Sequence, residues 1–229
     1  MNGQGYILNL GLIDYAKAWD LQHYLWSKRV EGELPDLVLL LEHPHVITLG
    51  RRGNRSNLIA SSEVMEAMKI PLYHVERGGD VTYHGPGQMV VYPILDLKKY
   101  GYRLIRYVDQ LEEIILQVLD DFGVKGRRDP LNRGVWVNQE KVASIGVVIK
   151  RWVSFHGFSL NYETDLKYFD LIHPCGLEGK KMTTMTKILG VQISKETLME
   201  RILFQFKRIF VRDWVVKTLE DVRCQNLLG

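Results

Sequence analysis

The sequence has few cysteines and no long apolar run. Cys175 and Cys224 are the only cysteines among 229 residues, which excludes a disulfide framework and suits a reducing compartment. No apolar run approaches the roughly 20 residues that cross a bilayer. The first residues contain neither a signal-peptide core nor an arginine-rich presequence. We therefore expect a cytoplasmic protein that does not associate with a membrane.

Charge, nucleotide and metal signals are also weak. A formal net charge of +3 at pH 7 is too small to indicate nucleic-acid binding, although it allows a local basic surface. The glycines at 78, 79, 85 and 87 match neither the Walker pattern nor the dinucleotide fingerprint. The residue types would allow a zinc site, but they lack the tight clustering of such sites: His43, His45, His84, His156 and Cys175. We expect no cofactor and no metal.

The composition and the order of elements predict one α+β domain over residues 1–229, with a C-terminal tail from about 213 to 229. With 46% hydrophobic and 25% charged residues, the chain is typical of a soluble globular protein. Strand patterns occur at 6–10, 37–41, 46–49, 72–75, 89–94, 134–137, 141–149 and 152–160, and helical patterns at 14–30, 61–68, 104–122 and 194–210. This order favours one central mixed, mostly antiparallel sheet flanked by helices. We expect the 46–49 run to be a partner strand of the buried 37–41 run.

Polar side chains and glycines are concentrated in residues 77–84, Arg-Gly-Gly-Asp-Val-Thr-Tyr-His. A glycine-rich backbone adopts unusual dihedral angles at little steric cost and so displays several polar groups in a small space. Strand-like runs precede and follow the segment, and loops carried by rigid strands often form binding sites. These features favour a binding site over a plain hairpin turn.

Cys175 follows Pro174 in a stretch where regular structure is not expected. A cysteine nucleophile needs a base or a cation nearby, because at a reference pKa of about 8.5 only a few per cent is thiolate at neutral pH. The sequence offers one lysine and two histidines: Lys141, His84 and His173. These residue types would also fit a Cys-His-Asp hydrolase.

Motifs spread over most of the chain occur in a characteristic order. They are Glu42-His-Pro, Thr48-Leu-Gly-Arg51, residues 77–88, Tyr92-Pro-Ile94, Gly134-Val-Trp-Val137, Lys141-Val-Ala-Ser-Ile-Gly146, Trp152-Val153, His156-Gly-Phe-Ser-Leu-Asn161, Pro174-Cys-Gly176 and Thr183-Thr-Met185. In these motifs the chain, from about residue 5 to 210, resembles the lipoyl(octanoyl) transferases of lipoate biosynthesis. The resemblance implies a biotin/lipoyl protein ligase-like fold. It also implies ping-pong transfer of an octanoyl or lipoyl group without ATP or metal.

The resemblance assigns roles to residues. Cys175 falls on the cysteine that carries the acyl thioester, and Lys141 on the lysine that pairs with it. Substrate binding falls on three segments: Arg77, Gly78, Gly79, Asp80, Val81, Thr82, Tyr83, His84; Ser144, Ile145, Gly146; and Gly157, Phe158, Ser159. The chain has Ser144 and Ser159 where the family often has alanine, and Thr184 where serine is usual. These departures concern the preferred acyl chain length.

Two further expectations concern the pocket. We expect an apolar slot for the acyl tail, lined by Val81, Met89, Ile145 and Phe158. Backbone N–H groups near Cys175 and in the Gly78-Gly79 turn are candidate oxyanion donors.

The resemblance also implies two acidic protein partners. The donor is octanoyl-acyl carrier protein, and the acceptors are lipoyl domains of 2-oxoacid dehydrogenases and the glycine-cleavage H protein. Basic side chains near the inferred site are candidates for docking them: Arg51, Arg52, Arg55, Lys180 and Lys181. We expect the enzyme to be a monomer.

Three alternatives remain open. One is an ATP-dependent lipoate-protein ligase of the same fold, which would need a nucleotide site and no cysteine nucleophile. Another is a non-catalytic acyl-binding module, for which alanine at Cys175 would leave function intact. The third is a thioester hydrolase, which would release a free acid where a transferase makes an amide.

Overall fold

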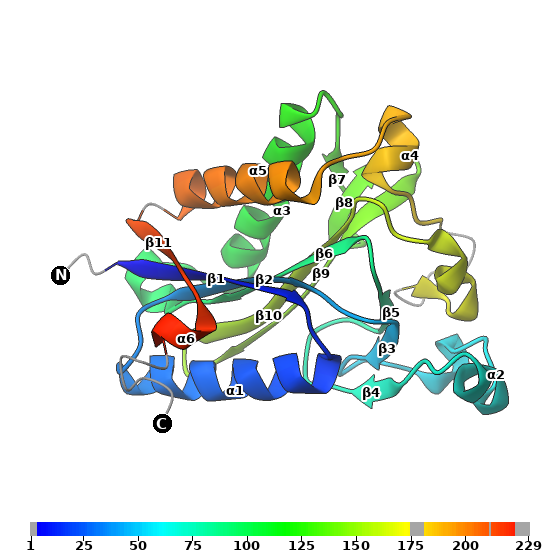
Figure 1. Ribbon diagram of the computed structural model, residues 1–229, viewed down its shortest axis with the longest axis horizontal. Coiled ribbons are helices and arrows are strands. Elements are labelled where there is room, and N and C mark those ends of the chain that lie inside the picture. Colours follow the sequence, from blue (N-terminus) through cyan, green and yellow to red (C-terminus); the bar gives the residue numbers. More distant parts are fainter. Residues whose placement is uncertain (1–3, 175–180, 211, 223–229) are drawn as a thin grey trace.

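A computed structural model describes residues 4–174, 181–210 and 212–222. An eight-stranded sheet with the strand order β11-β1-β2-β6-β10-β9-β8-β7 runs through its centre (Figure 1). Its strands are β1 (Gly5–Leu12), β2 (Leu37–Glu42), β6 (Gln88–Ile94), β7 (Arg127–Arg128), β8 (Gly134–Val137), β9 (Glu140–Lys150), β10 (Val153–Asn161) and β11 (Trp214–Lys217). β1 is parallel to β2 and to β11, and the other neighbours are antiparallel. The predicted mixed, mostly antiparallel sheet is confirmed.

A second sheet has the order β4-β3-β5. Its strands are β4 (Leu72–His74), β3 (Val46–Leu49) and β5 (Val81–His84). The prediction that residues 46–49 pair with the 37–41 run is therefore wrong. Pro44 lies between the two runs, and a proline cannot donate a backbone hydrogen bond to a continuing ladder. Residues 81–84, expected to display side chains from a loop, are instead a strand paired with β3.

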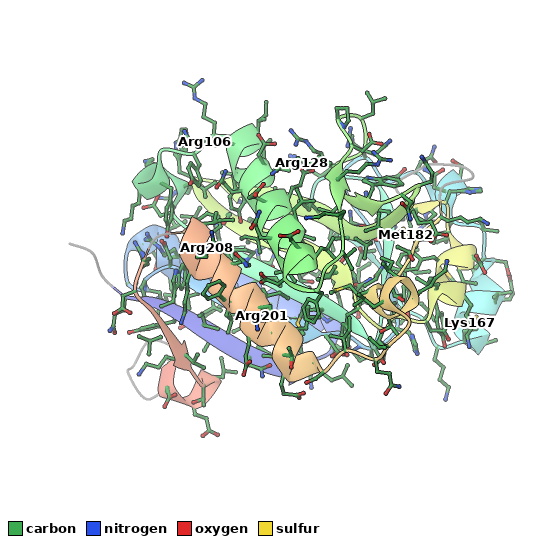
Figure 2. All side chains as sticks on the ribbon, turned by 90° about the horizontal axis from the view of Figure 1, so that it is seen from above. Arg106, Arg128, Lys167, Met182, Arg201 and Arg208 are labelled. Carbon is green, nitrogen blue, oxygen red and sulfur yellow. The ribbon has the colours of Figure 1, made fainter. Side chains whose placement is uncertain are left out.

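Helices cover both faces of the main sheet. α1 (Tyr15–Glu31) covers one face, and α3 (Leu104–Asp121) lies beside α5 (Lys195–Ile209) on the other (Figure 1; Figure 2). Alternate residues of β2 pack toward opposite faces, Val38 and Leu40 in the α3/α5 core and Leu39 in the α1 core. Since both faces are covered, the whole strand is buried, which explains its unbroken apolar sequence.

Side-chain caps begin the helices where the sequence predicts them. Asp14 Oδ1 accepts a hydrogen bond from the Lys17 N–H, and Ser194 Oγ from the Thr197 N–H, so each satisfies an N–H that the helix leaves unpaired. The shorter helices are α2 (Ser62–Ala67), α4 (Met185–Leu189) and α6 (Leu219–Val222), with 3-10 turns at Arg55–Asn57, Leu97–Tyr100 and Leu166–Leu171. Within the described ranges no helix combines the length and apolar character of a transmembrane span.

Part of the segment predicted as a C-terminal tail is a strand. β11 pairs in parallel with β1, with Trp214 opposite Gly5. The connection into it is anchored on the fully buried Asp36, whose carboxylate lies 3.1 Å from Arg212 Nη1 and 2.6 Å from Arg29 Nε. A buried carboxylate is tolerated when such partners compensate its charge. Residues 223–229, including Cys224, lie outside the described residues.

Glu42, at the end of β2, joins three other parts of the fold. Its carboxylate accepts hydrogen bonds from the Gly87 N–H (3.0 Å) and the Tyr162 hydroxyl (2.9 Å), and lies 2.6 Å from Lys195 Nζ. Burial alone would raise the pKa of this carboxyl, but hydrogen bonds from Lys195, Gly87 and Tyr162 hold the pKa below its ordinary value. The turn after the 77–84 segment is thereby attached to the main sheet and to α5.

The substitution Glu42→Gln tests this attachment. Because the folded-state pKa is lowered, ionised Glu42 stabilises the protein above its unfolded pKa of about 4.3, and this stabilisation is lost as the pH falls. We expect Glu42→Gln to lower the free energy of unfolding by about 1–3 kcal/mol at pH 7. Urea denaturation should show the difference from wild type shrinking below about pH 4. Glu66→Gln, at an exposed position of α2, is the control, and a difference unchanged at pH 3 would contradict the assignment.

Candidate functional site

An inner pocket lies between residues 77–84 and the middle of β9 and β10. The residues predicted to bind substrate all line it, except Tyr83. Tyr83 is on the opposite face of β5 from Thr82 and His84, as alternation along a strand requires, and its hydroxyl pairs with His45 Nδ1 at 2.7 Å. The sequence therefore predicts the location of the pocket, although its substrate stays a prediction. Three further lining residues were missed: Tyr15, Tyr92 and His156.

Close approach between two backbones forms the wall of this pocket. The Gly78 N–H donates to the Val147 carbonyl at 3.1 Å. A Cβ atom at Gly146 would lie only 2.9 Å from the Gly78 oxygen, so this position of β9 needs glycine for the turn to approach. Gly78 was also a candidate oxyanion donor, and its N–H is already committed to this bond. The Gly79 N–H, the other candidate in the turn, makes no hydrogen bond among the described residues.

Arg77 is a buried part of the wall, and its guanidinium is held by the protein. The side chain is 7% exposed, and its Nη2 donates to the Thr48 carbonyl at 2.8 Å. Nη1 donates to the Gly78 carbonyl at 3.1 Å. These bonds fix the guanidinium between β3 and the turn, so that it shapes the pocket.

Residues 50–57 run beside the same turn. The N–H groups of Arg51 and Arg52 donate to the carbonyls of Arg77 and Gly79. Asp80 adds a side-chain link, since its carboxylate accepts from the Asn54 N–H and the Asn57 amide. The arginine-rich loop is therefore attached to the mouth of the pocket, as its place in the sequence suggested.

A chain of buried hydrogen bonds runs from the pocket wall to Lys141. His84 Nδ1 pairs with Gln88 Oε1 at 2.7 Å, and Gln88 Nε2 donates to Asn161 Oδ1 at 2.8 Å. Asn161 Nδ2 then donates to the Thr183 carbonyl at 3.2 Å, and the Thr183 N–H donates to the Lys141 carbonyl at 2.9 Å. Buried polar groups that are all paired in this way hold one arrangement.

Burial keeps two histidines near the pocket, His43 and His84, in the neutral form at pH 7. Burial lowers the pKa of His43 to about 4, and burial together with the nearby His43 lowers the pKa of His84 well below its ordinary value. His43 Nδ1 donates to the Ile13 carbonyl, so its Nε2 accepts from the Tyr92 hydroxyl. Among the residues that the structure describes, no three His, Cys, Asp or Glu side chains gather as metal ligands would.

A larger outer cavity of about 660 Å³ lies next to the inner pocket. The two share the Gly78-Gly79 turn, Asp80, Ile145 and Gly146. The outer cavity is lined further by Arg51, Arg52, Asn57, Arg133 and Lys141 and by apolar side chains of α3, β9 and residue 131. Leu104, Ile105 and Leu131 on this rim are 52%, 67% and 89% exposed.

Lys141 is buried at the edge of the outer cavity. Its side chain is 3% exposed, its Nζ donates to the Arg133 carbonyl at 2.7 Å, and it lies 5.5 Å from the centroid of the Trp136 ring. A solvated lysine at the edge of a sheet would hold none of these contacts. The structure thus excludes the simplest alternative for Lys141, while its role in catalysis stays a prediction.

Cys175 lies outside the described residues, as do Gly176 and Lys180. The described residues on both sides of this stretch are attached to residues that line the outer cavity. The His173 N–H donates to the Asn57 carbonyl at 2.8 Å, and the Lys141 N–H donates to the Lys181 carbonyl at 2.9 Å. His173, Pro174 and Lys181 themselves line a separate cavity, and these backbone bonds join His173 and Lys181 to the lining of the outer cavity.

The predicted acyl slot is partly corrected. Val81, Ile145 and Phe158 line the inner pocket. Met89 does not line it, since it is fully buried in the core between the main sheet and α3. Alternation along β6 separates the faces: Tyr92, an odd number of residues away, faces the pocket.

A family model and curated relatives both place the chain among lipoyl protein ligases and octanoyltransferases. Residues 14–207 match the family model of the lipoyl protein ligase A/B catalytic domain. An octanoyltransferase of Syntrophobacter fumaroxidans is 53% identical over 96% of this chain and 96% of its own length. An octanoyltransferase of Solibacter usitatus is 50% identical over 88% of this chain and 90% of its own.

Solved structures with the same fold are much more distant in sequence. A lipoate-protein ligase A bound with ATP has a TM-score of 0.74 at 13% identity, covering 96% of this chain and 90% of its own. A putative lipoate protein ligase from Thermoplasma acidophilum with bound lipoic acid has a TM-score of 0.72 at 13% identity, covering 95% and 90%. At this identity the likeness concerns the fold alone.

Proposed function

The chain belongs to the lipoyl protein ligase A/B catalytic family as an octanoyltransferase of lipoate biosynthesis, and we propose that it carries the octanoyl group as a thioester on Cys175, with Lys141 as the charged partner. One observation supports this pair above all. Lys141 is buried at a cavity that shares wall residues with an apolar pocket, and its own N–H is bonded to the carbonyl of Lys181, just after the cysteine-containing stretch.

In the first half-reaction the Cys175 thiolate attacks the carbonyl carbon of the donor thioester. The tetrahedral intermediate expels the thiolate of the carrier, and the Lys141 ammonium gives it a proton. An ammonium near a thiol favours its thiolate form. One thioester replaces another, so the step is nearly isoenergetic and needs no ATP. The Gly79 N–H is the remaining donor in the 78–79 turn for the oxyanion.

In the second half-reaction the lysine amine of a lipoyl domain attacks the Cys175 thioester. Lys141, now neutral, accepts the proton that the amine loses, and Cys175 leaves as a thiolate. The product is an amide, which is more stable than the thioester, so the reaction runs downhill. Lys141 returns to the ammonium form for the next cycle.

We assign the octanoyl tail to the inner pocket. Val81, Ile145 and Phe158 give it apolar walls, and burying about six methylenes contributes roughly 5 kcal/mol to binding at about 0.8 kcal/mol each. Ser144 and Ser159 are cross-strand neighbours on β9 and β10 and also line this pocket. Their hydroxyls bear on chain-length preference, because they would meet the acyl tail.

The rim of the outer cavity suits a carrier protein with an acidic face. The side chains of Arg51 and Arg52 make no ion pair among the described residues, and exposed Leu104, Ile105 and Leu131 lie at the same cavity. We propose octanoyl-acyl carrier protein as the donor here, with lipoyl domains and the glycine-cleavage H protein as acceptors. A cytoplasmic location and a monomeric state stay predictions.

Intact-protein mass spectrometry tests the thioester. The purified chain is incubated with octanoyl-acyl carrier protein, with Cys175→Ala and Lys141→Ala beside wild type. We expect wild type to gain an octanoyl mass that hydroxylamine removes, and Cys175→Ala to gain none. Lys141→Ala should acylate at least 100-fold more slowly, within the usual contribution of general acid–base catalysis, about 10²–10⁴-fold. A lipoyl domain added afterwards should become octanoylated without ATP.

Other outcomes would select other reactions. Acylation of the lipoyl domain only with ATP and free octanoate would identify an ATP-dependent ligase. Release of octanoate without amide formation would identify a hydrolase. Full activity of Cys175→Ala would contradict the proposed thioester.

Charge reversal at the rim tests donor docking. Arg51→Glu and Arg52→Glu should each raise KM for octanoyl-acyl carrier protein about tenfold, with kcat nearly unchanged and a weaker dependence of kcat/KM on salt. Arg201→Glu is the matched control, because Arg201 is exposed on α5 (Figure 2) and does not line the cavity. Equal kinetics of the rim and control variants would exclude this docking surface.

A further inference from the structure

A buried carboxylate lies on the far side of the peptide bond that Lys141 contacts. The Arg133 carbonyl accepts the hydrogen bond from Lys141 Nζ at 2.7 Å. The N–H of the same peptide unit, that of Gly134, donates to Glu112 Oε1 at 2.9 Å. Glu112 belongs to α3 and is 0% exposed. One peptide unit thus connects an acidic and a basic side chain that do not touch each other.

The two hydrogen bonds strengthen each other. The peptide is planar and trans, so its N–H and C=O point in opposite directions. A carboxylate at the N–H and an ammonium at the C=O polarise the peptide in the same sense, and hydrogen bonds in such a chain are cooperative. Both bonds also involve an ionisable side chain, and charge-assisted hydrogen bonds are stronger than neutral ones.

Glycine is required for this arrangement. Gly134 has φ +122°, and a Cβ atom there would lie 2.3 Å from the Ala143 oxygen and 2.6 Å from Lys141 Cε. Any side chain would push the peptide away from Lys141. The backbone at Gly134 therefore packs directly against the Lys141 side chain.

The charge of Glu112 is compensated from the surface. Arg133 Nη1 lies 3.1 Å from Glu112 Oε2, and Arg128 Nε lies 3.4 Å from it; Figure 2 shows Arg128 beside α3. Arg133 Nη1 also contacts the half-exposed Asp109 at 2.6 Å. Asp109 shares the arginine but makes no contact with the Gly134 N–H, which makes it a natural control.

We propose that Glu112 is a positioning residue for Lys141 and acts through the Arg133–Gly134 peptide. It anchors the N–H end of this peptide, which orients the carbonyl that holds Lys141 Nζ at the edge of the outer cavity. The inference rests on the proposed role of Lys141. It gives a role in the reaction to Glu112, which does not line the cavity.

Several other charged groups lie around Lys141. Glu112, Arg128 and Arg133 lie on the α3 side, and Arg51, Arg52 and Asp80 line the outer cavity. Glu140 precedes Lys141 and pairs with Lys187, and Lys181 is bonded to the Lys141 backbone. Of these, only Glu112 is bonded to the N–H of the peptide that accepts from Lys141.

The experiment compares Glu112→Gln with Asp109→Asn in the full chain. For Glu112→Gln we expect kcat for octanoyl transfer to fall at least tenfold, with KM for octanoyl-acyl carrier protein within about twofold of wild type. Asp109→Asn should keep the wild-type kcat and KM.

A merely structural role would give a different result. Glu112→Gln would then lower the melting temperature while the folded fraction keeps the wild-type kcat, and this would overturn the proposal. An equal fall of kcat in Asp109→Asn would also overturn it, since the effect would then come from the charge of Arg133. If Lys141→Ala itself retains full transfer, the proposed function fails first.

A second measurement leaves Glu112 unchanged. NMR of the Gly134 amide proton in wild type and Lys141→Ala reports the polarisation of the peptide directly. We expect the resonance to move upfield in Lys141→Ala, because the carbonyl loses its charged donor and the N–H becomes less acidic. An unmoved resonance in a folded variant would overturn the coupling through the peptide.

Discussion

The hydrogen bond from the Gly78 N–H to the Val147 carbonyl holds the site together. It joins the turn before β5, in the small sheet, to β9 in the main sheet. The inner pocket is the space enclosed where these two backbones meet, and the outer cavity begins on the other side of the same turn. The absence of a side chain at Gly146 allows this approach. Both the apolar slot and its entrance depend on this contact.

Lys141 is buried, and both its side chain and its backbone are hydrogen-bonded. Its Nζ is held by the Arg133 carbonyl, and its backbone is paired with residues 181 and 183. A buried ammonium is costly unless such partners compensate it. These contacts hold the lysine in one defined position, as its proposed role in proton transfer requires. The proposed role of Glu112 extends this organisation into α3.

Prediction from the sequence succeeded where local patterns decide the structure and failed where distant segments meet. Periodicity located the helices that begin near Asp14 and Ser194 and the strands at 134–137, 141–149 and 152–160. It did not reveal that β3 joins a second sheet, because pairing partners are chosen by packing rather than by propensity. Tyr83 was grouped with its neighbours in sequence, yet the strand turns it to the other face. Tyr15 carries no local signal for the pocket and reaches it from α1, whereas His156 directly precedes the predicted Gly157 on β10.

The sequence by itself determined the family, the fold class, the candidate pair Cys175 and Lys141, and most of the pocket wall, because the motifs are contiguous and each carries its own turn chemistry. Only the tertiary structure decided which side chains share a cavity and which N–H groups are already bonded. It also decided which carboxylate binds the far end of the peptide that Lys141 contacts. Such relations join residues far apart in the chain, as Glu112 and Lys141 are on α3 and β9. Their physical basis is long-range packing and backbone hydrogen bonding, which leave no periodic trace in the sequence.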